Sequence, residues 1–177
     1  MGHMAAPAFT ERLNEQIGNE FEAHQQYIAI ATYYDALTMP QMAALFYQQA
    51  QEKRDHAMMM VQYLLDADHT PVIPAIAAPR FDFADVVEPV AAALEQEKRV
   101  TEQINDLTRI ARENNDYASD QFMQWFIKEQ VEEVSKMSDL LAVVTRSKDD
   151  YERIEDWVAR EEKSAGADPT APRIAGA

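Results

Sequence analysis

Apolar residues recur at the three-to-four-residue spacing of an α-helix along four long stretches of the chain and one short one. These stretches cover about residues 9–37, 40–66, 86–113, 117–147 and 151–163. Within each stretch the apolar side chains share one stripe and charged residues occupy the rest of the surface, as in helices that pack around a common core. The sequence therefore predicts an all-α protein with four long helices and a short fifth helix.

The break between the second and third predicted helices constrains how they connect. Residues 68–85 contain Pro71, Pro74 and Pro79, and prolines at this density prevent a helix. An extended segment of about 15 residues reaches about 50 Å, whereas a helix of about 28 residues is about 42 Å long. The segment can therefore cross the whole bundle, so that the third helix runs parallel to the second. This predicts a four-helix bundle with one long crossover connection and a short C-terminal helix.

The composition is consistent with a helical protein and excludes several classes of function. Gly18 is the one glycine between residues 3 and 165, which excludes glycine-rich phosphate loops and tight β-hairpin turns. Cysteine is absent, which excludes disulfides, thiol catalysis and thiolate metal sites. Because Gly18 lies inside the first predicted helix, we expect another backbone to come close to it.

The chain is predicted to form one domain, residues 5–163, between two unlike ends. Residues 1–4, Met-Gly-His-Met, resemble the remnant of an expression tag. Residues 164–177 are small or polar and contain two prolines, which predicts a flexible tail. No signal sequence and no apolar run long enough to span a membrane is found, so we expect a cytoplasmic protein without membrane contacts.

The charge balance is strongly acidic and points to cations as partners. With 16 Lys and Arg against 31 Asp and Glu, the formal net charge is −15. A domain with this charge repels phosphate backbones, so we expect no nucleic-acid partner.

Each long predicted helix also carries polar residues within its apolar stripe near mid-length, because each residue advances about 100° around a helix. These residues are Glu20, Glu52, Lys53, His56, Glu97, Glu129, Gln130 and Glu133. One such residue alone is more simply interpreted as a hydrogen-bonded core side chain. Carboxylates from four helices repel one another unless cations join them, and carboxylates with imidazole but no thiolate suit iron, manganese or zinc. The pattern favours a metal centre between the helices, as in di-iron carboxylate bundles.

The segments around these residues resemble bacterial non-haem ferritins, most closely those of actinobacteria. The matching segments are residues 13–21, 51–57, 96–101, 121–133 and 157–161. The resemblance covers about residues 8–163, in order and with matching spacings. It implies a ferritin-like bundle that assembles with copies of itself, as a homo-oligomer, into a hollow shell of twenty-four subunits and stores iron.

The resemblance further implies a ferroxidase centre, where Fe(II) is oxidised by dioxygen or peroxide before a ferric mineral forms inside the shell. Glu20 and His56 would hold the first iron. Glu97 and Glu133 would hold the second, with Gln130 beside it.

By the same resemblance, Tyr27 would stand close to the irons as a redox-active or hydrogen-bonding neighbour. Glu52, Glu129 and Glu132 would hold a third iron. Haem-binding bacterioferritins place a methionine two residues before the histidine of the second helix, whereas this chain has Arg54 there. We therefore expect no haem.

One position departs from the family pattern. Ferritins usually place a glutamate three residues before His56, where it bridges the irons, and this chain has Lys53. An ammonium has no lone pair for a metal, and the non-catalytic light chains of animal ferritins also carry lysine there. We expect Lys53 to form an ion pair with Glu97 or Glu20 and to impair two-iron oxidation. Alternatively, Lys53 turns to solvent and Glu52 takes its place as a ligand.

Three functions remain open from the sequence. The first is an iron-storing ferroxidase, and the second is a non-catalytic storage or nucleation subunit that co-assembles with a catalytic ferritin chain. The third is a DNA-protecting mini-ferritin, which is disfavoured because Arg173 is the only basic residue of the tail.

Overall fold

The computed structural model describes residues 5–161 and 166–177, and this part of the chain forms five α-helices without strands. The helices are α1 (Pro7–Ala36), α2 (Pro40–Asp66), α3 (Glu88–Glu113), α4 (Tyr117–Arg146) and α5 (Tyr151–Glu161). The expected tag remnant at residues 1–4 and the expected end of the fifth helix at 162–163 lie outside the described residues. In the described part, no helix is long and apolar enough to cross a membrane.

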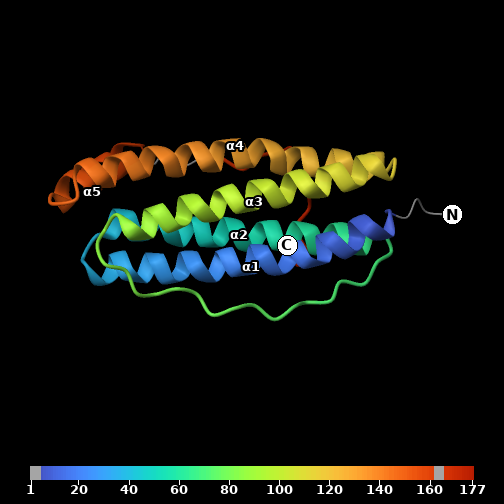
Figure 1. The fold of residues 1–177 in the computed structure, drawn as a ribbon, viewed down its shortest axis with the longest axis horizontal. Helices are drawn as coiled ribbons and strands as arrows, with labels where there is room; N and C mark the ends of the chain where they lie inside the picture. Colours follow the sequence, from blue (N-terminus) through green and yellow to red (C-terminus); the bar gives the residue numbers. More distant parts are fainter. Residues whose placement is uncertain (1–4, 162–165) are drawn as a thin grey trace.

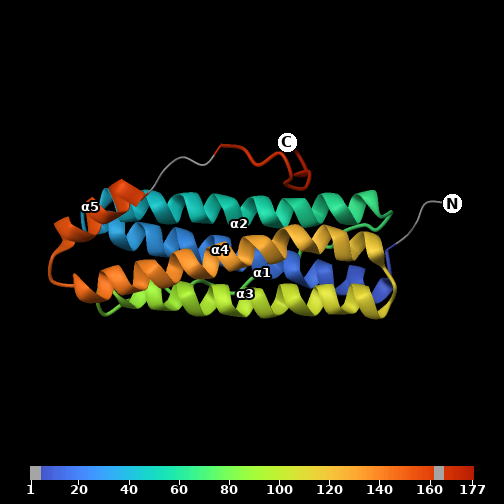
Figure 2. The same cartoon turned by 90° about the horizontal axis from the view of Figure 1, so that it is seen from above.

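The four long helices lie side by side in one bundle, and α5 turns back across its end (Figures 1 and 2). α1 and α2 form one antiparallel pair, and α3 and α4 form another. The segment between α2 and α3 returns along the whole bundle, so that α2 and α3 run parallel (Figure 1). The predicted all-α, four-helix bundle with one long crossover and a short fifth helix is confirmed.

The apolar core is divided into two clusters along the bundle axis. The cluster towards α5 contains Tyr34, Phe46 and Leu140 among its buried residues, and the cluster towards the opposite end contains Phe9 and Leu64. On every long helix, the residues of the two clusters are separated by the polar positions that the sequence singles out. The helices therefore pack by apolar contacts at both ends and enclose a polar layer between them.

The crossover connection is held on α1 by side chains that lie four or eight residues apart on one face of the helix. Asn14 donates to the carbonyl of Val72 and accepts from its backbone N–H, both at 2.8 Å. Gln26 makes the same pair of bonds with the backbone of Arg80, at 2.7 and 2.9 Å. Glu22, between them, accepts from a third connector N–H at 3.3 Å. These bonds satisfy backbone groups of a segment that has no secondary structure of its own.

Gly18 completes this row of positions on α1. A Cβ atom added there would lie 2.8 Å from Cγ of Pro74 in the connector. The expected neighbour of Gly18 was a backbone, and the structure places the ring of Pro74 there instead. The absence of a side chain at this position lets the connector lie directly on the helix.

The described part of the tail, residues 166–177, makes contacts with the bundle. Residues 166–177 run along α2 (Figure 2), where the N–H of Ala175 donates to the carbonyl of Met58 at 3.1 Å. Ile174 packs against the apolar cluster at that end of the bundle, and Ala175 is buried in it. The indole N–H of Trp125 donates to the carboxylate of Asp168 at 3.0 Å. Small residues permit this close approach, which composition alone does not reveal.

The effect of Gly18→Ala on the stability of the protein is expected to change sign with the residue at position 74. Alanine stabilises a helix interior by about 1 kcal/mol over glycine, but here its Cβ would overlap Cγ of Pro74. We expect G18A to lower the melting temperature of the protein and to raise it in a P74A background, as measured by circular dichroism. A gain of equal size in both backgrounds would show that the connector does not press on α1.

Candidate metal centre

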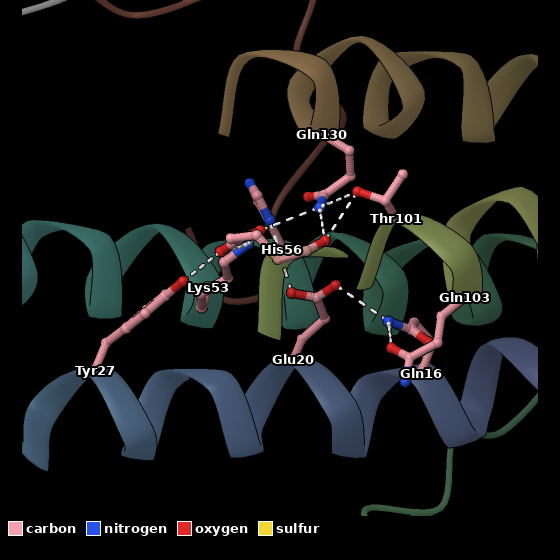
Figure 3. Close-up of polar contacts among 9 residues, drawn as sticks. Gln16, Glu20, Tyr27, Lys53, His56, Thr101, Gln103 and Gln130 are labelled. Carbon is pink, nitrogen blue, oxygen red and sulfur yellow. Dashed lines mark hydrogen bonds and ion pairs between the residues drawn. The ribbon is translucent and has the colours of Figure 1, made fainter. Parts of the chain in front are cut away.

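The polar layer between the two apolar clusters brings together seven of the residues singled out from the sequence. Side chains from all four long helices meet there: Glu20 and Tyr27 from α1, Lys53 and His56 from α2, Glu97 from α3, and Gln130 and Glu133 from α4. Figure 3 shows five of them, Glu20, Tyr27, Lys53, His56 and Gln130, directed towards the space between the helices. All seven are buried. Each comes from the inward stripe of its helix, so regular helix geometry is sufficient to aim them at one another.

Lys53 and Glu97 form a buried ion pair at the centre of this layer. The ammonium nitrogen of Lys53 lies 2.9 Å from one carboxylate oxygen of Glu97 and 3.0 Å from the other. Both side chains are 0% exposed. Burial disfavours the charged ammonium, but the attraction of Glu97 and Glu20 outweighs it and raises the pKa of Lys53 above its usual value. Lys53 is therefore a permanent cation inside the bundle.

Glu97 receives further hydrogen bonds from the remaining helices. The hydroxyl of Tyr27 donates to Oε1 of Glu97 at 2.5 Å, and Nε2 of Gln130 donates to Oε2 at 3.1 Å. Gln130 is itself held by the hydroxyl of Thr101 at 3.1 Å. Burial and the charge of Glu97 raise the pKa of Tyr27 well above its usual value, so the phenol keeps the proton that it donates. Both oxygens of Glu97 are thus occupied by donors of the protein.

On the opposite side of the layer, the buried carboxylates have fewer hydrogen-bond partners. Nδ1 of His56 lies 3.8 Å from Oε2 of Glu20, too far for a hydrogen bond. Oε2 of Glu20 and Oε2 of Glu133 have no hydrogen-bond partner among the described residues, although both atoms are buried. Buried carboxylate oxygens without donors favour a cation. These three side chains are the ones that could hold a metal ion.

The distances nevertheless do not form a finished metal site. Within residues 5–161 and 166–177, no three His, Asp or Glu side chains stand close enough together to hold a metal ion. Glu97 is directed to Lys53 instead of to a shared point with Glu20, His56 and Glu133. Metal binding on this side therefore requires the remaining three side chains to close around the ion.

The two carboxylates that lack a full set of donors differ in protonation. Burial raises the pKa of Glu20, but the neighbouring His56 and Lys53 outweigh it, so the pKa is lowered overall. For Glu133, burial and the repulsion of Glu97 outweigh the attraction of Lys53 and raise the pKa to about 7. The single cation of Lys53 is therefore not sufficient to hold the pKa of Glu133 at its usual value.

The three carboxylates expected to hold a third iron lie outside the buried layer. Glu52 and Glu129 are half-buried and Glu132 is exposed. Partial burial and repulsion by Glu132 raise the pKa of Glu129, and Glu52 and Asp168 add to the repulsion. The structure thus gathers these side chains beside the buried layer, together with a tail carboxylate that the sequence did not suggest.

Several neighbours of the centre were not found from the sequence. Gln16 and Thr101 each lie four residues from a predicted carboxylate, and this helical spacing is a signal that could have found them. Trp125 stands edge-on to His56, with ring centres 5.4 Å apart, and is held by Asp168. The pairing of Trp125 with a tail residue leaves no local signal because it depends on tertiary structure.

Removing the charge of Glu133 should affect stability in a pH-dependent way. The raised pKa means that the folded protein holds this proton more tightly than the unfolded chain. The resulting stabilisation is present below about pH 4.5 and is lost as the pH rises through about 7. Because glutamine mimics the protonated carboxyl, the metal-free E133Q variant should gain more in melting temperature over the wild type at about pH 8 than at about pH 5.

The matched control is Glu102→Gln, which removes an exposed carboxylate on α3. Its difference from the wild type should stay constant between the two pH values. If E133Q gains the same melting temperature over the wild type at both pH values, the raised pKa of Glu133 is contradicted.

The fold is shared with solved ferritin structures. An open-pore ferritin from the hyperthermophilic archaeon Archaeoglobus fulgidus superposes with a TM-score of 0.83 at 24% sequence identity, over 88% of this chain and 96% of that chain. A humanized archaeal ferritin gives a TM-score of 0.85 at 24% identity, over 90% of this chain and 99% of that chain. At this level of identity the likeness establishes the fold.

Sequence relatives are considerably closer. Ferritin BfrB of Mycolicibacterium smegmatis is 51% identical over 168 residues, covering 95% of this chain and 93% of that protein. Ferritin BfrB of Mycobacterium tuberculosis is 47% identical with the same coverage. A bacterial non-heme ferritin of Staphylococcus aureus is 36% identical over 83% of this chain and 89% of that protein. Residues 10–147 match the family described as the ferritin-like domain. The chain therefore belongs to the ferritin family.

Proposed function

We propose that this chain stores iron as a subunit of a ferritin shell and that Lys53 takes the place of a metal ion in its buried centre. Membership of the ferritin family and the names of the relatives support iron storage. The observation that carries the second part is the ammonium of Lys53, fully buried and 2.9 and 3.0 Å from the two oxygens of Glu97. On this proposal the chain is a storage subunit with an impaired oxidation centre.

The ammonium opposes a second metal for two reasons. Lysine offers no lone pair while protonated, and at about 4 Å a unit charge repels a divalent cation by about 8 kcal/mol at an effective dielectric constant of about 20. Glu97 is also unavailable as a ligand, because Tyr27, Lys53 and Gln130 occupy both of its oxygens. The half of the centre that contains Glu97 is therefore closed to iron.

The other half retains side chains that could bind one cation. Glu20, His56 and Glu133 supply two unpaired carboxylate oxygens and an imidazole. Reduction of dioxygen to peroxide consumes two electrons and two protons, and each Fe(II) supplies one electron. A centre that holds a single iron cannot supply both electrons at once, so paired oxidation of Fe(II) would be slow.

Storage would then rely on the acidic surface and on oxidation elsewhere. Glu129 of α4 is repelled by Glu132, by Glu52 of α2 and by Asp168 of the tail, beside the centre. Such a surface attracts ferrous ions and can nucleate ferric mineral, within a shell whose subunits each carry a net charge of −15. A catalytic ferritin chain co-assembled in the same shell, or dioxygen in solution, would supply the oxidation.

A second candidate is an active ferroxidase. It is favoured by the unpaired oxygens of Glu20 and Glu133 and by Glu52, which precedes Lys53 and is half-buried. This candidate requires Lys53 to leave Glu97 and turn to solvent so that a carboxylate can enter.

The rate of Fe(II) oxidation separates the two candidates. We expect the metal-free wild-type protein to oxidise Fe(II) slowly in stopped-flow absorbance measurements, and Lys53→Glu to raise the initial rate about tenfold or more by restoring a bridging ligand. Lys53→Met removes the cation without adding a ligand and should give no such gain. Wild-type rates equal to those of K53E would overturn the proposed role of Lys53 and support the active ferroxidase.

Melting temperature provides an independent readout of the same substitution. Removing one partner of a buried ion pair costs about 3–5 kcal/mol, so metal-free K53E should melt below the wild type. Anaerobic Fe(II) or Zn(II) should restore most of the loss in K53E and little in K53M.

The assembled size tests the storage shell itself. Twenty-four copies of a 20.1 kDa chain have a mass of about 480 kDa, and size-exclusion chromatography with light scattering should give this value. A monomer or dimer under all conditions would contradict storage in a shell, whatever the role of Lys53.

A further inference from the structure

Three arginines surround a cavity at the end of the bundle where α4 passes into α5. The cavity has a volume of about 330 Å³ and is lined by Val143, Arg146, Ser147, Arg153, Trp157 and Arg160. None of these residues belongs to the candidate metal centre. The volume lies at the lower end of the range of about 300–1,000 Å³ that small-ligand sites occupy.

The helix that forms one wall of this cavity is held firmly in place. Ile154 and Val158 on α5 are buried in the adjacent apolar cluster. The carboxylate of Glu155 accepts the backbone N–H groups of Gln41 and Met42 at the start of α2, both at 2.9 Å. A carboxylate at a helix N-terminus is favourable. The backbone positions of the two α5 arginines, Arg153 and Arg160, are therefore well fixed relative to the bundle.

The spacing of residues along α5 places the cavity side chains on one face. Arg153, Trp157 and Arg160 are four and three residues apart, which stacks them along a single stripe of a helix. Arg146 reaches the same cavity from the last turn of α4. Two helices thus place guanidinium groups around the same cavity. Trp157 lies between the two arginines of α5 along the helix.

The three guanidinium groups lack carboxylate partners. Within residues 5–161 and 166–177, none of Arg146, Arg153 and Arg160 makes a side-chain hydrogen bond or an ion pair. Arginines elsewhere on this acidic protein do, as shown by Arg109 with Glu113 at 3.0 Å. Like charges gathered around one cavity repel unless an anion joins them.

Helix electrostatics explains only part of this arrangement. Arg146 and Arg160 stand in the last turns of α4 and α5, where a cation is favourable. Arg153 stands in the first turn of α5, where the helix end is itself positive. The helix dipole therefore does not stabilise the charge of Arg153, and its exposed guanidinium is accessible to an anion from solution.

We propose that this cavity binds a phosphate oxyanion, either as inorganic phosphate or as a phosphate monoester. The planar fork of a guanidinium matches two phosphate oxygens, and three arginines suit a group with two negative charges. Val143 and Trp157 supply an apolar wall that excludes water from one side of the ligand. This site is independent of the proposed role of Lys53.

The proposal is tested by calorimetric titration of the assembled, iron-free protein at low ionic strength, with inorganic phosphate in one arm and AMP in the other. We expect wild-type protein to bind phosphate and Arg153→Gln to weaken the affinity about tenfold or more, because a charge-assisted contact is lost. Arg146→Gln should act in the same direction. Tighter binding of AMP would identify a monoester as the ligand, and equal binding would identify the free ion.

Arg109→Gln is the matched control, because it removes the same charge at the opposite end of the bundle, next to the turn between α3 and α4 (Figure 1). It should change the affinity by less than about twofold. Absence of phosphate and AMP binding by the wild type, or an equal loss in R109Q and R153Q, would overturn the proposal.

Discussion

The bonding of Glu97 determines how the four long helices come together at mid-length. This carboxylate on α3 receives a hydrogen bond from Tyr27 on α1, an ion pair from Lys53 on α2 and a hydrogen bond from Gln130 on α4. One side chain therefore joins all four helices at the level where apolar packing is interrupted. In a metal-binding bundle, a cation from solution makes this connection. Here the cation is covalently part of the chain, so the bundle can complete its interior before any iron arrives.

This built-in cation also divides the polar layer into two unequal halves. The half around Glu97 has its charges and hydrogen bonds satisfied, whereas Glu20 and Glu133 each keep a buried oxygen without a donor. The pKa of Glu133 is raised because burial and the charge of Glu97 outweigh the attraction of Lys53. One ammonium therefore does not balance all the carboxylates of the layer. This asymmetry, with one side complete and the other open, is the basis of the proposal that the centre holds a single ion.

The sequence predicts features whose causes are local. Helical periodicity locates the five helices, and Pro71, Pro74 and Pro79 define the crossover, because both depend on neighbouring residues alone. The inward positions of Glu97 and Lys53 follow from the same periodicity, but periodicity leaves both Glu97 and Glu20 as possible partners of Lys53. The choice depends on how the helices are rotated against each other. The contact of Trp125 with Asp168 depends on a tail whose composition carries no helical or strand pattern, so only the folded chain reveals it.

The attachment of the crossover to α1 affects how its sequence can vary. Asn14 and Gln26 bind main-chain atoms of the connector, so the side chains at most connector positions contribute little to holding it. Val72, Ile73 and Phe81 indeed point outwards, 70, 60 and 78% exposed. Substitutions there leave the attachment intact, whereas deletion of one residue would move every later backbone group out of register with its partner on α1. The crossover therefore tolerates changes of its exposed side chains better than changes of its length.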